Sequence, residues 1–403
     1  MKLVLHIGTE KTGTTSIQRY LNRNSGALQE KGFFYSKSLG RPNNIDIAVY
    51  GMDLDPEDPF FLQRAIFDVD DHAAFRTKLQ RDLAAEVAAA RDAGCHAFVI
   101  SNEHCHSRLT RADQVAPVHA LLSRVFDHVE ILCYIRPQVE LAISLASTVA
   151  RMERVTADYF EHIDAADPYY DYHALLARWT GFFGRDAMTV VPFKSVENPA
   201  ADFARRLGVS NWQEIANDRI NASLDVHTIA MLNAIGAQAY ILPGQITRHP
   251  VPFVEDLPVI EKIKLPLVLA QRIQSQFSDV NRQLIDEWPS ITSEDIEPDW
   301  SRFDHDGNLD KLLLPSPLGD YLKPLVAGFN RRSWLDGAQL NLAFSERAEA
   351  RGKLQNALAF LAQARAFTGL VRQTFGTSEP LEKIEQYIEK LGERVEKNLA
   401  SRR

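Results

Sequence analysis

The most constraining stretch of this chain is its N-terminus, where a short apolar segment runs into a loop bounded by two glycines. Residues 3–7 are almost wholly apolar and predict a buried strand. The loop runs from Gly8 to Gly13, and a segment rich in threonine and serine then begins an amphipathic stretch that reaches about residue 29. A strand, a tight loop and a helix start bring unpaired N–H groups and the positive end of a helix dipole together. This order favours binding of an anion, most often a phosphate.

The position of the lysine in this loop separates two kinds of phosphate chemistry. A Walker loop carries lysine directly after its second glycine, but here Thr14 holds that place and Lys11 lies inside the loop. A cation there can contact the oxygen that bridges a phosphate to a transferred group, while nearby hydroxyls bind the phosphate. Those hydroxyls belong to Thr14, Thr15 and Ser16. The plainer alternative is a solvated lysine beside an ordinary helix cap.

The bulk properties narrow the class of protein. A chain of 403 residues can form one large or two modest domains with a substantial core. Its net charge of −8 argues against general nucleic-acid binding, which needs a basic face. The apolar runs are shorter than a membrane helix or a signal peptide requires, and the three cysteines lack metal-binding or redox spacing. We therefore expect a cytoplasmic protein with reduced thiols and no metal site.

Strands and helices alternate through the first half of the chain. The expected strands cover residues 3–7, 32–35, 97–100, 129–135 and 188–193, and the expected helices cover 14–29, 73–93, 113–126, 138–154, 169–183 and 200–207. This rhythm predicts an α/β fold with a three-layer, P-loop NTPase-like parallel sheet between helices. Ligands bind at the C-terminal edge of such a sheet. The loop at 8–16, residues 101–106 and Arg136 onward would all open onto that edge.

The second half predicts a different organisation. Residues 223–335 are mostly helical with many prolines and would form a substrate-binding or lid part, with residues 243–258 as a lid or a substrate loop. We assign residues 1–335 to the α/β domain and residues 336–403 to a helical extension. The last helix has apolar residues at coiled-coil-like spacing. It predicts either a cap on the domain or an arm for oligomerisation or a partner.

A second phosphate site follows the fourth expected strand. Arg136 comes directly after that strand and Ser144 lies two turns into the next helix, so a guanidinium and a hydroxyl can hold one phosphate. Taken with the segment from Lys11 to Ser16, this pair resembles bacterial, carbohydrate-type sulfotransferases that use 3'-phosphoadenosine 5'-phosphosulfate. In that family K-[ST]-G-T-[TS] follows the first strand, and an Arg with a Ser eight residues later holds the 3'-phosphate.

The resemblance spans about residues 1–225 and fades toward residue 335. It includes Phe193, where the family often has an aromatic residue after the fifth strand. The chain departs from the family pattern in lacking a late Arg-Lys-Gly element, for which Arg331 or Arg332 would have to substitute. The family implies cofactor contacts from a set of nine residues, namely Lys11, Thr12, Gly13, Thr14, Thr15, Ser16, Arg136, Ser144 and Phe193.

The resemblance also implies a reaction, the transfer of a sulfonate to a hydroxyl of a carbohydrate or glycolipid, leaving adenosine 3',5'-bisphosphate. Lys11 would stabilise the leaving phosphate without a metal. Glu103 would be the base, since its Ser-x-Glu setting resembles carbohydrate sulfotransferases with a glutamate base. His104 and His106 are its rivals, because imidazole titrates near neutrality.

Partners and competing functions follow from the same residues. The expected partner is a sugar or glycolipid acceptor, with peripheral membrane contact only through that acceptor and with the C-terminal helices as a route to a homo-oligomer. One competing function is a P-loop nucleotide or small-molecule kinase. Two features argue against it: position 14 holds a threonine in place of the Walker lysine, and no acidic residue of the Walker-B type is evident on an expected strand. The other is a non-catalytic nucleotide-binding scaffold that works through its helical extension.

Overall fold

A five-stranded sheet forms the centre of the computed structural model, which describes all residues except 152, 210–222, 236–256, 314–315 and 402–403. The strands are β1 Lys2–Gly8, β2 Phe33–Tyr35, β3 Ala97–Ser101, β4 His128–Ile135 and β5 Met188–Pro192. They lie in the order β2-β3-β1-β4-β5, and every neighbouring pair is parallel. The predicted α/β fold with a parallel sheet is confirmed.

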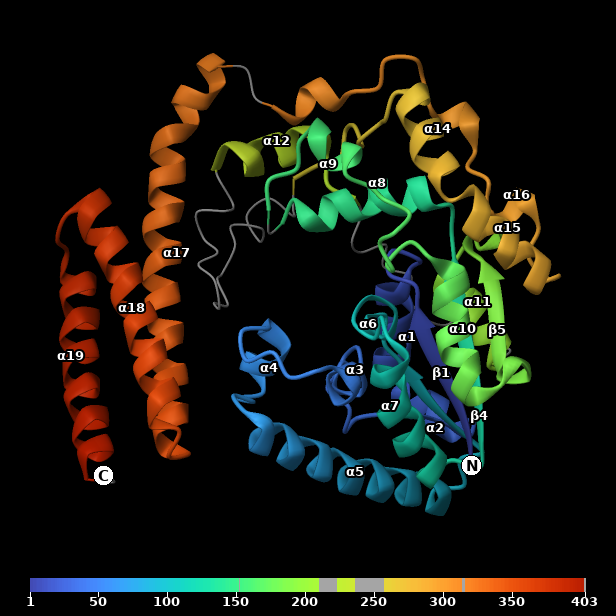
Figure 1. The fold of residues 1–403 in the computed structure, drawn as a ribbon, viewed down its shortest axis with the longest axis horizontal. Coiled ribbons are helices and arrows are strands. Elements are labelled where there is room, and N and C mark those ends of the chain that lie inside the picture. The colour runs from blue at the N-terminus through green and yellow to red at the C-terminus, as the bar shows by residue number, and fades with distance from the viewer. Residues whose placement is uncertain (152, 210–222, 236–256, 314–315, 402–403) are drawn as a thin grey trace.

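Helices cover both faces of this sheet (Figure 1). The first part of the chain contains α1 Thr14–Arg23, α2 Ser25–Glu30, α3 Asp46–Gly51, α4 Pro59–Gln63, α5 Val69–Asp92, α6 His104–Ser107, α7 Ala112–Val125, α8 Gln138–Val149, α9 Ala157–Glu161, α10 Tyr172–Phe183 and α11 Pro199–Arg206, with the 3₁₀ turns η1 Arg185–Ala187 and η2 Phe193–Ser195. Alternate strand residues enter two different cores: Leu5 joins the core with α5, α7 and α10, whereas Val99 joins the core with α1, α2 and α11. This period of two is what a sheet covered on both faces requires.

The predicted helix ends differ from the observed ones where a side chain caps the backbone. The helix expected at 73–93 begins at Val69, because the Asp68 carboxylate accepts a hydrogen bond from Asp71 N–H, 2.9 Å away. The helix expected at 14–29 is two helices that meet at Asn24, whose side-chain amide donates to the carbonyl of Tyr20. The helix expected at 138–154 ends at Val149, and the one expected at 169–183 begins at Tyr172.

The helices after residue 225 form two groups, which we call the cover and the bundle. The cover contains α12 Val226–Ile235, α14 Leu267–Gln276, α15 Ser278–Glu287 and α16 Ser293–Ile296, with the turns η5 Trp300–Arg302 and η6 Leu309–Leu312, and the bundle contains α17 Ser316–Ala350, α18 Leu354–Phe375 and α19 Glu379–Ala400. Most of the predicted lid at 243–258 falls outside the described residues. Within the described part of the chain, no helix combines the length and apolar character needed to cross a membrane.

The bundle stands beside the α/β body and has its own apolar core (Figure 1). The apolar stripe of α19 is buried there, from Leu381 through Ile388 to Val395. Phe67, from the segment between α4 and α5, joins the same core, and its ring lies 5.4 Å from that of Phe360. The coiled-coil-like spacing is therefore satisfied within the chain, and an assembly through these helices would need another surface.

Candidate functional site

Three polar strand exits meet at one edge of the sheet, as the sequence predicts. Strands β3, β1 and β4 are neighbours and parallel, so the segments that follow them converge. Between them lies a cavity of about 390 Å³, which we call the loop cavity. It is lined by Glu10, Lys11, Gly13, Thr14, Thr15, Ser16, Glu103, His104, Ser144, Thr148 and Arg151.

The loop before α1 is shaped by its own hydroxyls and by glycine. Thr9 Oγ1 donates to the carbonyl of Tyr134 (2.9 Å), and Thr12 Oγ1 donates to the carbonyl of Thr9 (2.6 Å). Gly13 has a φ of 81°, and a Cβ there would lie 2.3 Å from the Pro199 ring, so only glycine fits. The Thr12 hydroxyl, expected to face a cofactor, instead braces the loop and is fully buried.

Lys11 points across the loop cavity toward α8. Its Nζ donates to Thr148 Oγ1, 2.8 Å away. Burial, together with the positive charge of Arg151, lowers the pKa of Lys11 to about 8. The ammonium is thus held where an anion would stabilise it.

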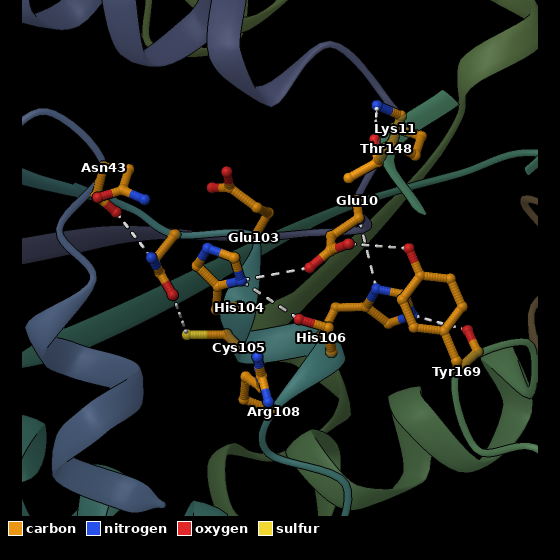
Figure 2. A network of polar contacts seen from close by, with 12 residues as sticks. Glu10, Lys11, Asn43, Glu103, His104, Cys105, His106, Arg108, Thr148 and Tyr169 are labelled. Carbon is orange, nitrogen blue, oxygen red and sulfur yellow. Dashed lines mark hydrogen bonds and ion pairs between the residues drawn. The ribbon is translucent and has the colours of Figure 1, made fainter. Parts of the chain in front are cut away.

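The two acidic residues of the cavity have different partners. Glu103 precedes α6, and its carboxylate accepts a hydrogen bond from Gln18 Nε2 of α1. Glu10 accepts a hydrogen bond from the Tyr169 hydroxyl (2.9 Å), and its other carboxylate oxygen lies 3.3 Å from His104 Nδ1. Figure 2 shows the Glu10 carboxylate between the His104 and Tyr169 side chains.

His106 is excluded as a base by its hydrogen bonds. Its Nδ1 accepts from the backbone N–H of Glu10 (3.3 Å), and its Nε2 donates to the carbonyl of Tyr169 (2.8 Å). The ring is completely buried, and burial lowers its pKa, so it stays neutral with both nitrogens used. His106 joins the loop to the segment before α10, and of the two rival histidines only His104 lines the cavity described here.

A second cavity adjoins the first through Ser144, which lines both. We call it the clamp cavity; it has a volume of about 470 Å³ and is lined by Arg136, Glu140, Ile143, Ser144, Ser147, Ser223, Lys262, Ile263, Lys264, Arg302 and Phe303. Arg136 donates through Nη1 to the carbonyl of Lys11 (3.0 Å) and through Nη2 to Glu140 (2.7 Å). The Arg136 guanidinium also lies over the Phe193 ring, 5.6 Å from its centroid.

The sequence reasoning missed several residues of both cavities. Lys262, Lys264 and Arg302 supply cations to the clamp cavity, and their signal in the sequence was only a lysine pair before a proline. Arg331 and Arg332, expected to take that part, lie on α17 and are not among the described residues that line either cavity. Glu10 and Glu140 were not singled out either, since a lone acid beside a basic residue is common on any surface.

Comparisons with protein-family models, curated proteins and solved structures gave no match. The chemistry of the site therefore follows from the side chains that line the two cavities. The described residues contain no group of three or more His, Cys, Asp or Glu side chains placed to hold a metal ion. What they do provide is a helix N-terminus, hydroxyls and cations for two anionic groups, and an imidazole and a carboxylate that could accept a proton.

Proposed function

We propose that this chain is a sulfotransferase with a P-loop-like, three-layer fold, which moves a sulfonate from 3'-phosphoadenosine 5'-phosphosulfate to a hydroxyl of a carbohydrate or glycolipid. The observation that carries this proposal is the wall shared by the two cavities. Arg136 donates to the carbonyl of Lys11, 125 positions away in the sequence, and Ser144 lines both cavities. Because the two cavities adjoin at Ser144, one ligand with two phosphates could reach both of them.

The groups that line the two cavities suit a nucleotide with a phosphate at both its 5' and its 3' position. At the loop cavity the N-terminus of α1, Lys11 and Thr15 face the space where a 5'-phosphosulfate would lie. At the clamp cavity four cationic side chains face one carboxylate. The Nε of Arg136 is buried without a hydrogen-bond partner in the part of the chain that the structure describes, which leaves a donor for a 3'-phosphate.

The donor, when bound, supplies the activated sulfonate, and the chain supplies charge and orientation. Lys11 would hold positive charge against the phosphate oxygen on which negative charge develops. Glu103 and His104 both line the same cavity as Lys11, so either is placed to accept the acceptor's proton.

Nucleotide binding tests the proposal directly. We expect isothermal titration to show adenosine 3',5'-bisphosphate binding at least tenfold more tightly than adenosine 5'-phosphate, since a charged clamp adds more than about 1.4 kcal/mol. Arg136→Ala combined with Ser144→Ala should erase that difference, whereas the exposed Arg111→Ala serves as the control. Tighter binding of ATP with magnesium would indicate a kinase, and equal binding of both adenosine phosphates would contradict the proposal.

Transfer itself is then measured with radiolabelled donor and fractionated cell-envelope glycans. Label should pass to a glycan fraction with the wild type and not with Lys11→Ala. Full activity of Lys11→Ala would remove that residue from the mechanism. Nucleotide binding without transfer to any acceptor would favour the scaffold function.

A further inference from the structure

We propose that Glu10 is a positioning residue that holds His104 with its Nε2 free to accept the proton of the acceptor hydroxyl. The inference rests on the proposed function for the identity of that hydroxyl, but the arrangement of the two side chains can be tested without it. His104 is then the base in place of Glu103, and Glu10 orients it.

Glu10 is fixed at three points. One carboxylate oxygen accepts from the Tyr169 hydroxyl at 2.9 Å, and the other lies 3.3 Å from His104 Nδ1. Its backbone N–H donates to the buried ring of His106. The carboxylate is mostly covered, with 16% of the side chain exposed. A carboxylate held in this way presents a fixed acceptor to the imidazole.

The Glu10 carboxylate stays ionised in this setting. Burial by itself would raise its pKa, but the hydrogen bonds and charge of His104, with the Ser107 hydroxyl, outweigh burial and hold the pKa of Glu10 at about 2. An anion beside Nδ1 favours the tautomer in which Nδ1 carries the proton. The second nitrogen, Nε2, is then left as an acceptor, as in histidine–carboxylate pairs of hydrolases.

The rest of the surroundings keep His104 beside the cavity. Its ring packs against the Phe60 ring, with 4.9 Å between the centroids, and it lines the loop cavity together with Lys11. The charged and titratable groups around it are Glu10 and Lys11 of the loop, Glu103 and His106 of the α6 segment, Arg108 over the Phe60 ring, and Arg151 after α8. Glu103, the rival base, accepts a hydrogen bond from Gln18 through one of its two carboxylate oxygens.

The proton transfer balances with the group transfer. The acceptor hydroxyl gives its proton to His104 Nε2 as its oxygen forms a bond to sulfur. The bond from sulfur to the bridging phosphate oxygen breaks, and its electron pair stays on that oxygen, next to Lys11. His104 becomes an imidazolium paired with Glu10. The imidazolium returns the proton to solvent after the products leave.

Nitrogen-15 NMR of histidine-labelled protein tests the positioning step, with His104→Asn used to assign the His104 signals. Wild-type protein should show neutral His104 protonated on Nδ1. Glu10→Gln should shift the population toward the Nε2-protonated tautomer, whereas Glu10→Asp should restore much of the wild-type pattern. Tyr169→Phe, which keeps the charge of Glu10, should change the signals least. An unchanged His104 tautomer in Glu10→Gln would overturn the inference.

Activity supplies the second readout, using radiolabelled donor and the glycan fraction that accepts the label. Glu10→Gln should lower kcat by about 10²-fold, at the low end of what a general base contributes, and His104→Asn should lower it at least as much. The KM for the donor should hardly change in either variant. If Glu103→Gln abolishes transfer while His104→Asn does not, the assignment is wrong. If the wild type transfers no label, the proposed function fails, while the NMR result still decides whether Glu10 sets the His104 tautomer.

Discussion

Nucleotide binding at the loop cavity should be coupled to protonation of Lys11. Burial and Arg151 lower the pKa of Lys11 to about 8, so close to half of this side chain is neutral at pH 8. A phosphate beside Nζ favours the charged form and raises the pKa again. Binding of adenosine 3',5'-bisphosphate at pH 8 must then draw protons from the buffer.

The size of the effect follows from that pKa. Proton uptake by Lys11 should approach about 0.5 per nucleotide at pH 8, whereas at pH 7 Lys11 is already mostly charged and takes up only about 0.1. The phosphates of the nucleotide have second pKa values near about 6, so they are fully ionised at pH 8 and add no uptake of their own. Above pH 8 the affinity should fall toward about tenfold per pH unit, as binding comes to require a whole proton.

Isothermal titration in buffers of different ionisation enthalpy measures this uptake, because the observed enthalpy varies with buffer in proportion to the protons taken up. Lys11→Met should bind with no uptake at pH 8 and with an affinity that is nearly independent of pH up to about pH 9. The exposed Lys31→Met is the matched control and should behave as the wild type. If Lys11→Met takes up as many protons as the wild type, another group titrates and the reasoning about Lys11 is wrong.

Three further predictions concern other parts of the site and the bundle. Glu140 lies 2.7 Å from Arg136 Nη2 in the clamp cavity, so Glu140→Gln should tighten binding of adenosine 3',5'-bisphosphate by up to about tenfold in titration; unchanged or weaker binding would show that no phosphate competes with this carboxylate. His106→Phe leaves two buried backbone groups unpaired and should cost about 1–3 kcal/mol in denaturant unfolding at pH 7. Burial lowers the pKa of His106, so below about pH 6.5 this side chain binds a proton in the unfolded chain but not in the folded chain. The free energy of unfolding of the wild type should therefore fall as the pH drops, and more steeply than that of the variant. Phe67→Ala should remove about 3–5 kcal/mol of packing against Phe360 and speed limited proteolysis of α17–α19, and an unchanged cleavage rate would contradict that contact.

The sheet and the loop were predictable because their signals are local. Alternating apolar residues and the spacing of Gly8 and Gly13 lie within a few residues of one another, and parallel pairing then brings the strand ends together without further information. The pairing of Arg136 with the loop follows from β4 being the neighbour of β1. Each of these steps needs only periodicity and the geometry of a parallel sheet.

The cations of the clamp cavity could not be predicted, because neutral amides bring them there. Gln138, at the start of α8, donates to Asn281 of α15 at 2.6 Å, and Gln274 of α14 donates back to Gln138 at 3.0 Å. These buried amides hold α14 and α15 against α8, and they have no charge pattern or period that a sequence could reveal. Lys264 precedes α14 and reaches the cavity only because of that packing.

The loop separates two opposite charges that stand next to each other in the sequence. Lys11 has a φ of 62°, a conformation that costs a residue with a side chain about 1–3 kcal/mol. This backbone sends Glu10 toward His104 and Tyr169 and sends Lys11 toward Thr148 on α8, as Figure 2 shows. The charge of Glu10 raises the pKa of Lys11, but burial and the charge of Arg151 outweigh it and lower that pKa. The strained turn thus directs the Glu10 carboxylate to the His104 imidazole and the Lys11 ammonium to the cavity where an anion would bind. An ordinary helical start at the same residues would not allow this.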